Sequence, residues 1–258
     1  MCKSEPVSSI QQGTDKFWGQ IYSFSLRYKP TSNPFVVVFH KFERKIVNLQ
    51  HTIPSFQPHK SMDVAILKYN AGNIYSVVNA LRHLGVEPKL TDDPELLAKA
   101  DRVIFPGQGE AKGAMDYLLA RGLDIVIRNL KQPVLGICIG QQLLCKHSQE
   151  GNTPCIGIFD VPVIRFQPNR HEQKVPAMGW NSLHDLQSPL FEGLQENDYV
   201  YFVHSFYVPL SPWTVATTDY ILPYSAALQK DNFYATQFHP EKSGKVGQRI
   251  LENFLQLT

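Results

Sequence analysis

The sequence lacks any long apolar run. No stretch approaches the roughly 20 apolar residues that a membrane-spanning helix needs. The first residues, MCKSEPVSSIQQGTDKF, also lack the apolar core of a secretory signal. Because 43 % of the residues are hydrophobic and 19 % are charged, the composition is that of a folded globular chain. We therefore expect a cytoplasmic protein with no membrane association.

Cysteine is scarce. The four cysteines, at positions 2, 138, 145 and 155, do not have the spacing of metal ligands, and a reducing compartment would keep them as thiols. The sequence therefore predicts no metal site and no disulfide framework. It leaves each cysteine to be explained by packing or by reactivity.

A strong excess of one charge is also absent, since the net charge is +2. Residues 62–258 hold 17 Lys or Arg against 20 Asp or Glu, so the main part of the chain has no basic footprint for nucleic acid. Residues 1–61 hold eight against three. This basic stretch is interrupted by prolines and predicts a loosely ordered N-terminal extension. A transit peptide, or sequence upstream of a true start at Met62, are the alternatives.

From Met62 onward, apolar runs of strand length alternate with helical periodicity. The runs DVAILKY, EPKLT, DRVIFPG and QPVLGI are separated by segments with apolar residues at helical spacing. Strands that alternate with helices pair in parallel through right-handed crossovers. Shorter strands joined by turns follow, and a C-terminal helix closes the chain. The fold class predicted for residues 62–258 is an α/β domain with an open, mostly parallel central sheet and flanking helices.

The stretch PVLGICIGQQLLC places Cys138 between Gly136 and Gly140, where a buried strand meets a run that could be helical. Gly-x-Cys-x-Gly is the thiol form of the nucleophile elbow, whose sharp turn exposes the nucleophile and leaves room only for small residues two positions away. A helix N-terminus there would stabilise a thiolate. A buried cysteine in a tight turn is the alternative, and it is the better explanation for Cys145 and Cys155.

A thiol nucleophile needs a base, and His239 in TQFHPEKS has the most suggestive neighbours. Pro240 favours an extended backbone at His239, so that His239 and Glu241 would project to the same side. Glu241 could then orient the imidazole while its other nitrogen faces the thiol. His204 is the main rival, although no carboxylate lies near it in the sequence.

A glycine-rich segment, FPGQGEAKGAM, follows another predicted strand. Glycines on both sides of Gln108 would let the backbone approach a ligand with its N–H groups turned inward. A plain connection between a strand and a helix explains the same residues.

Together these motifs resemble the triad-type, class I glutamine amidotransferases, which share a PGxG loop, a GxCxGxQ elbow and a distal HPE. Within that group, KYNAGNIYSV, KVPAMGWN, YFVHSFY and ATQFHPEKS are similar to the glutaminase subunits of imidazole glycerol phosphate synthase. The resemblance spans residues 62–258. Gln108 departs from it, because relatives usually carry valine in this loop.

The resemblance implies hydrolysis of glutamine to glutamate and ammonia with no metal or organic cofactor. Cys138 would attack the carboxamide, His239 would move the proton, and Glu241 would hold the imidazole. Further residues are implied to bind the substrate or the oxyanion. They are the loop residues Gly107, Gln108 and Gly109, the backbone of Ile139, and Gln142, Ser205 and Phe206, which would help hold the glutamine.

The resemblance also implies a partner. Ammonia would pass to a separate (β/α)₈ barrel cyclase subunit, in a heterodimer that makes imidazole glycerol phosphate and an aminoimidazole carboxamide ribonucleotide in histidine biosynthesis. The implied partner surface comprises Asn73, Met178, Trp180 and Lys242. Two alternatives remain open at this point: a glutaminase for anthranilate, carbamoyl phosphate or guanylate synthesis, and a non-catalytic regulatory module on the same fold.

We expect residues 1–61 to be dispensable, because the extension shows no core of its own and its charge balance is opposite to that of the domain. A chain that starts at Met62 should match the full chain in thermal unfolding and in glutaminase activity. A large loss of either would contradict the assignment of residues 1–61 as an appendage.

Overall fold

The computed structural model describes residues 62–69 and 74–257. The predicted N-terminal extension, residues 1–61, and the predicted partner residue Asn73 lie outside the described residues, so both remain predictions. None of the described helices is long and apolar enough to cross a membrane.

A seven-stranded sheet forms the centre of the domain, in the order β11-β12-β13-β4-β3-β1-β2. Strands β2, β1, β3, β4 and β13 pair in parallel, whereas β12 and β11 are added antiparallel at one side. The predicted mostly parallel sheet is therefore confirmed. Its strands are β1 (Val64–Leu67), β2 (Lys89–Thr91), β3 (Arg102–Phe105), β4 (Val134–Ile137), β11 (Thr214–Tyr220), β12 (Leu222–Lys230) and β13 (Phe233–Thr236).

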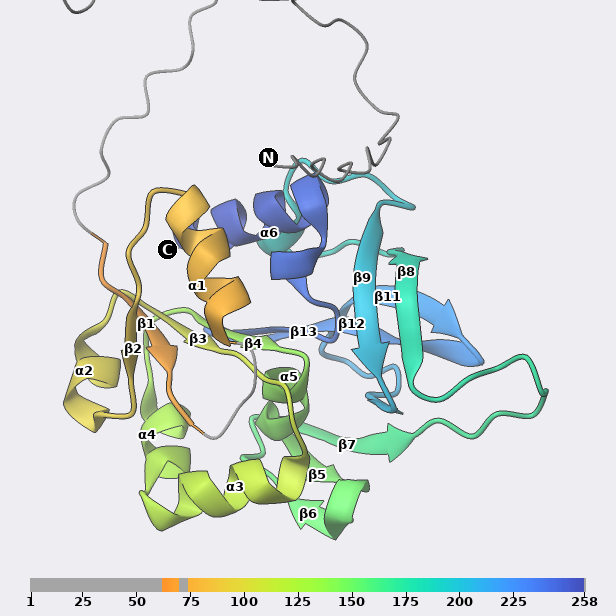
Figure 1. Cartoon of the computed structure of the whole chain (residues 1–258), viewed down its shortest axis with the longest axis horizontal. Coiled ribbons are helices and arrows are strands. Elements are labelled where there is room, and N and C mark those ends of the chain that lie inside the picture. The colour runs from red at the N-terminus through yellow and green to blue at the C-terminus, as the bar shows by residue number, and fades with distance from the viewer. Residues whose placement is uncertain (1–61, 70–73, 258) are drawn as a thin grey trace, which may run out of the picture. The chain divides into compact units, whose positions relative to one another are not determined.

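Helices cover both faces of this sheet, as Figure 1 shows, with α1 and α6 on one face and α3, α4 and α5 on the other. Alternate residues of each parallel strand point to opposite faces, so the wholly buried runs VAIL and VLGI supply both hydrophobic cores. The helices are α1 (Ile74–His83), α2 (Pro94–Lys99), α3 (Ala111–Ala120), α4 (Leu123–Asn129), α5 (Ile139–Leu144) and α6 (Gly244–Gln256).

Two smaller sheets complete the described domain. A four-stranded sheet has the order β10-β7-β5-β6, and β8 pairs antiparallel with β9 in a separate two-stranded ribbon. Short 3₁₀ turns connect these parts. The remaining bounds are β5 (Cys145–Ser148), β6 (Thr153–Pro154), β7 (Phe159–Arg165), β8 (Ala177–Ser182), β9 (Tyr199–His204), β10 (Phe206–Tyr207), η1 (Glu150–Asn152), η2 (Pro189–Phe191) and η3 (Pro240–Lys242).

Most of the expected elements are present. The segment GAMDYLLARGLDIVIRNL, whose pattern fits either one helix or two, forms two helices, because the chain turns at Gly122, where φ is +65°. The helix after the elbow ends at Leu144 rather than continuing through QQLLCKH, because Cys145–Ser148 pairs with β7 as strand β5. Tertiary pairing overrides the helical pattern there.

Helix α6 is fixed to the sheet by its apolar side, and Phe254 is fully buried there. Phe254→Ala should lower the free energy of unfolding by about 3 to 5 kcal/mol, because it removes buried surface and leaves a cavity. Leu119→Ala, on the exposed side of α3, is the matched control and should change it by less than about 0.5 kcal/mol. Urea unfolding of both variants measures this difference, and equal losses would contradict the packing described.

Candidate active site

Four neighbouring parallel strands end at one edge of the central sheet, and each is followed by residues that could bind a ligand or react with it. Tyr69 follows β1, residues 106–109 follow β3, Cys138 follows β4, and residues 237–239 follow β13. The carboxyl edge of an open α/β sheet is the usual place of a ligand site. A cavity of about 440 Å³ opens here, lined by Gln108, Gly109, Cys138, Ile139, Gln142, Glu150, Pro176, Tyr201, Val203, His204, Ser205, Phe206, His239 and Lys242.

Cys138 occupies a strained turn between β4 and α5. Its φ of 55° and ψ of −105° lie in a region that residues other than glycine rarely adopt. Its N–H donates to the Thr236 carbonyl oxygen at 2.7 Å, which ties the turn to β13. The strand-turn-helix context confirms the predicted elbow geometry, with the thiol at the N-terminus of α5.

The two glycines of the elbow are required by close approach. A Cβ on Gly140 would lie 2.0 Å from the carbonyl oxygen of Phe105, and a Cβ on Gly136 would lie 2.8 Å from Cδ1 of Leu144. The positive φ belongs to Cys138 and to neither glycine. The glycines therefore allow α5 to pack against β3 and β4, instead of providing the unusual backbone angles of the turn itself.

His239 and Glu241 form a buried pair. Nδ1 of His239 lies 2.8 Å from Oε1 of Glu241, and the two side chains are 1 % and 3 % exposed. The expected extended backbone at His239 is confirmed, but the strand alternation expected through Glu241 is wrong, because residues 240–242 form the 3₁₀ turn η3. This turn, and not the alternation of a strand, carries Glu241 back to the ring. Ser243 stabilises the turn by donating its hydroxyl to the carbonyl oxygen of His239 at 2.6 Å.

The electrostatics of this pair favour a protonated imidazole. Burial opposes a charge on His239, but its interactions with Cys138 and Glu241 outweigh burial and raise the pKa of His239 to about 10. Nε2 of His239 is buried and has no hydrogen-bond partner among the described residues. That nitrogen is thus available to the thiol, which lines the same cavity.

The predicted glycine-rich loop packs directly against the elbow. A Cβ on Gly107 would lie 1.8 Å from Cγ2 of Ile139, so the loop backbone contacts the first residue of α5. The Tyr69 hydroxyl donates to the carbonyl oxygen of Pro106 at 2.5 Å and anchors the loop at its start. The loop and the N-terminus of α5, which sequence reasoning assigned to one oxyanion site, are therefore adjacent.

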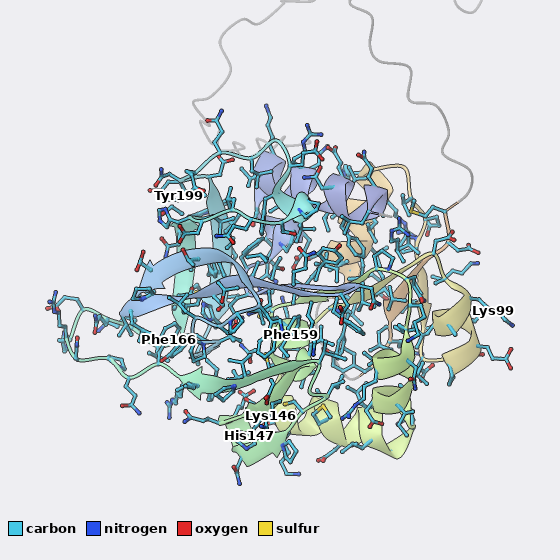
Figure 2. All side chains as sticks on the ribbon, turned by 180° about the vertical axis from the view of Figure 1, so that it is seen from behind. Lys99, Lys146, His147, Phe159, Phe166 and Tyr199 are labelled. Carbon is cyan, nitrogen blue, oxygen red and sulfur yellow. The ribbon has the colours of Figure 1, made fainter. Side chains whose placement is uncertain are left out.

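The rival histidine, His204, is fully engaged in the interior. Its Nδ1 donates to the carbonyl oxygen of Phe206 at 2.7 Å, and its Nε2 accepts from the Tyr224 hydroxyl at 3.0 Å. Burial lowers its pKa to about 4, so the ring is neutral at neutral pH. Phe166, labelled in Figure 2 just after β7, lies with its ring centroid 5.3 Å from that of His204. These contacts hold β9 to the core and leave no free nitrogen for a base.

The predicted substrate residues Gln142, Ser205 and Phe206 all line the cavity. The amide nitrogen of Gln142 is already committed, because it donates to the carbonyl oxygen of Phe206 at 3.1 Å and to Oε1 of Gln237 at 3.0 Å. Gln142 thus connects α5 to the segment that carries Ser205 and Phe206.

Sequence reasoning missed two residues of this site. Nε2 of Gln237 lies 3.7 Å from Sγ of Cys138; its position two residues before His239, at the end of a strand, was an available signal. Glu150 lines the cavity, and its Oε2 accepts from the N–H of Ala111 at 2.7 Å. Partial burial raises the pKa of Glu150. No pattern in HSQEGN indicated Glu150, which reaches the cavity through η1.

Three of the predicted partner residues are described, and they lie on the ribbon and at the cavity. Met178 and Trp180 are 71 % and 56 % exposed on β8, and Lys242 lines the cavity. Tyr199 on β9, labelled in Figure 2 at the edge of the molecule, is also exposed.

The other described cysteines are packed in the core, as predicted. Burial raises the pKa of Cys145 well above its usual value and that of Cys155 to about 12, so both are poor nucleophiles. Within residues 62–69 and 74–257, no group of three or more His, Cys, Asp or Glu side chains is arranged to hold a metal ion.

Comparison with known proteins connects this geometry to a family. Residues 65–257 match the family model described as glutamine amidotransferase class-I. The imidazole glycerol phosphate synthase subunit HisH of Bacteroides thetaiotaomicron is 63 % identical over 196 residues, which cover 76 % of this chain and 100 % of that protein. The HisH subunit of Escherichia coli K12 is 43 % identical over 198 residues, with the same coverage of both chains.

Solved structures agree at the level of the fold. A crystal structure of a glutamine amidotransferase superimposes with a TM-score of 0.58 at 22 % identity, covering 75 % of this chain and 97 % of that one. PurLQS from Thermotoga maritima superimposes with a TM-score of 0.55 at 17 % identity, covering 76 % and 98 %. At such identities these likenesses concern the fold alone.

His204 should make folding depend on pH. Its pKa is about 4 in the folded state and near the usual 6.5 when unfolded, so its stabilising contribution is complete above 6.5 and is lost as the pH falls toward 4. The loss amounts to at most about 3 kcal/mol. His204→Gln should remove this part of the pH dependence, measured by urea unfolding at neutral pH and at about pH 4.5.

His83→Gln, on the exposed side of α1, is the matched control and should keep the wild-type pH dependence. If His204→Gln also kept it, the buried neutral state assigned to His204 would be wrong.

Proposed function

The chain belongs to the family of imidazole glycerol phosphate synthase HisH subunits, within the class I glutamine amidotransferases, and we propose that Cys138, His239 and Glu241 form its catalytic triad. Family membership makes it an enzyme that hydrolyses glutamine in histidine biosynthesis. The similarity to HisH subunits favours this assignment over a role in another amidotransferase and over a non-catalytic regulatory module. The observation that supports the triad is that Cys138, in its strained elbow, and His239, which is paired with the buried Glu241, line one cavity.

The reaction proceeds in two halves. The Cys138 thiolate attacks the side-chain carbonyl carbon of glutamine, and the tetrahedral intermediate collapses to a thioester as His239 gives its proton to the leaving ammonia. His239 then takes a proton from water, whose oxygen attacks the thioester and releases glutamate and the thiolate. Glu241 keeps the imidazole oriented and stabilises its positive charge.

The oxyanion of each intermediate needs N–H donors close to the sulfur. The backbone N–H of Ile139 begins α5, and the dipole of the turn there favours negative charge. A second donor comes from the loop of Gly107, Gln108 and Gly109, which packs on Ile139. One such donor typically contributes about 10²- to 10³-fold to turnover.

The remaining cavity residues fit the amino-acid end of glutamine. Glu150 is the acidic residue among the described residues that line the cavity, so we assign it to the substrate ammonium. Its second oxygen accepts from Ala111, which fixes the carboxylate. Gln142, Ser205 and Phe206 line the same cavity and complete the proposed subsite.

The complex forms with the cyclase subunit of the synthase, and we propose a heterodimer with a (β/α)₈ barrel. Met178 and Trp180 on β8 are exposed, and their strand pairs with β9, whose residues Tyr201 and Val203 line the cavity. A partner on this face would close the cavity mouth, so that ammonia would enter the cyclase and not the solvent. Lys242, and Asn73 by its family position, complete the proposed surface.

Cys138→Ala should abolish glutamine-dependent synthesis by the assembled enzyme, a fall of about 10³-fold or more, because no thioester can form. Synthesis from added ammonia should persist, since only the glutaminase half uses the thiol. Both activities are measured with the cyclase and its nucleotide substrate present.

Cys155→Ala, which removes a buried thiol outside the cavity, is the control and should retain both activities. A Cys138→Ala enzyme that still hydrolysed glutamine at the wild-type rate would refute the nucleophile assignment.

A further inference from the structure

A chain of three hydrogen bonds connects the backbone of β10 to the sulfur of Cys138. Nε2 of Gln142 donates to the carbonyl oxygen of Phe206 at 3.1 Å and to Oε1 of Gln237 at 3.0 Å. Nε2 of Gln237 lies 3.7 Å from Sγ of Cys138. Both glutamine side chains are buried, so water does not compete for these bonds.

The donor and acceptor of each of these hydrogen bonds follow from the one made to the backbone. A carbonyl oxygen can only accept, so the atom of Gln142 that faces Phe206 must be the amide nitrogen. The second hydrogen of that nitrogen then requires an acceptor, which makes the facing atom of Gln237 its oxygen. The amide nitrogen of Gln237 is therefore the atom left to face the sulfur, as an N–H donor.

We propose that Gln237 is a positioning residue for the nucleophile: its amide N–H donates to the Cys138 thiolate and holds the sulfur toward the cavity. The inference rests on the proposed function, since it concerns the same thiol. It adds a neutral donor that the triad does not include. A hydrogen bond to a charged acceptor stabilises it enough to shift the equilibrium between thiol and thiolate by about tenfold or more.

The sulfur has a complementary contact for its protonated form. Sγ of Cys138 lies 3.8 Å from the carbonyl oxygen of Val203, which can only accept. The thiol donates its hydrogen to Val203, and once that proton has passed to Nε2 of His239 the thiolate accepts from Gln237. One position of the sulfur thus serves both protonation states.

The other titratable groups near Cys138 do not supply this donor. His239 and Glu241 carry the charges of the triad, and Glu150 and Lys242 line the same cavity. Tyr69 and Tyr224 interact electrostatically with Cys138, but burial raises the pKa of each phenol, so both stay neutral. The Tyr69 hydroxyl donates to Pro106 and that of Tyr224 to His204.

Two substitutions test the proposal in the full chain bound to the cyclase subunit. Gln237→Leu removes the donor. Gln237→Glu keeps the shape and the acceptor for Gln142, and presents an oxygen to the sulfur in place of the N–H. The rate at which iodoacetamide alkylates Cys138 is followed from about pH 5 to about pH 9. The values of kcat and KM for glutamine are measured on the same variants.

We expect the pH midpoint of alkylation to rise by about one unit in Gln237→Leu and by at least as much in Gln237→Glu. The value of kcat should fall about tenfold while KM changes by less than about threefold, because the lost interaction acts on the nucleophile.

Gln141→Leu is the matched control. Gln141 is buried on the same helix as Gln142, but its amide makes no hydrogen bond among the described residues. The control should keep the wild-type alkylation profile. A wild-type profile in folded Gln237→Glu, or an equal shift in Gln141→Leu, would overturn the proposal. Alkylation requires no turnover, so a wild-type chain that failed to hydrolyse glutamine would refute the proposed function and leave this test decisive.

Discussion

The parallel alignment of β3, β4 and β13 is the constraint on which the site depends. Because these strands run in the same direction and lie side by side, their carboxyl ends deliver the loop, the thiol and the histidine to one edge. The bond from the Cys138 N–H to Thr236 extends this pairing by one residue into the strained turn. The sheet thus fixes the positions of Cys138, directly after β4, and of His239, three residues after β13, while η3 adds Glu241.

The buried pair of His239 and Glu241 shows how the interior stabilises a charge that catalysis needs. An isolated imidazolium would be strongly disfavoured at a side-chain exposure of 1 %, and His204 illustrates that outcome with a pKa lowered to about 4. His239 differs because a carboxylate is carried to it by η3 and a thiol lies on its other side. Two histidines that line one cavity therefore have opposite protonation preferences, because only His239 has a carboxylate and a thiol beside its ring.

Local patterns in the sequence predicted the parallel half of the fold and the motifs of the site. The runs VAIL and VLGI are wholly buried, so their apolar continuity indicated central strands. The elbow followed from a local strand-turn-helix pattern, whereas the turn η3 that carries Glu241 to His239 was not predicted. Nothing local indicated that Cys145–Ser148 would leave the helix, or that β8 and β9 would form a separate ribbon, since both follow from long-range pairing. Gln237 and Glu150 were missed for the same reason: their roles depend on partners far along the chain.

The exposed side chains of Met178, Trp180 and Tyr199 also have a consequence for the chain before it is assembled. Residues of the ribbon that point inward, such as Val200 and Phe202, are buried in the core, so the ribbon cannot turn its apolar outer face away from water. An apolar face of this kind promotes self-association in proportion to concentration. Avoiding self-association, and not only catalysis, therefore favours production of the chain in equal amounts with the protein that covers this face.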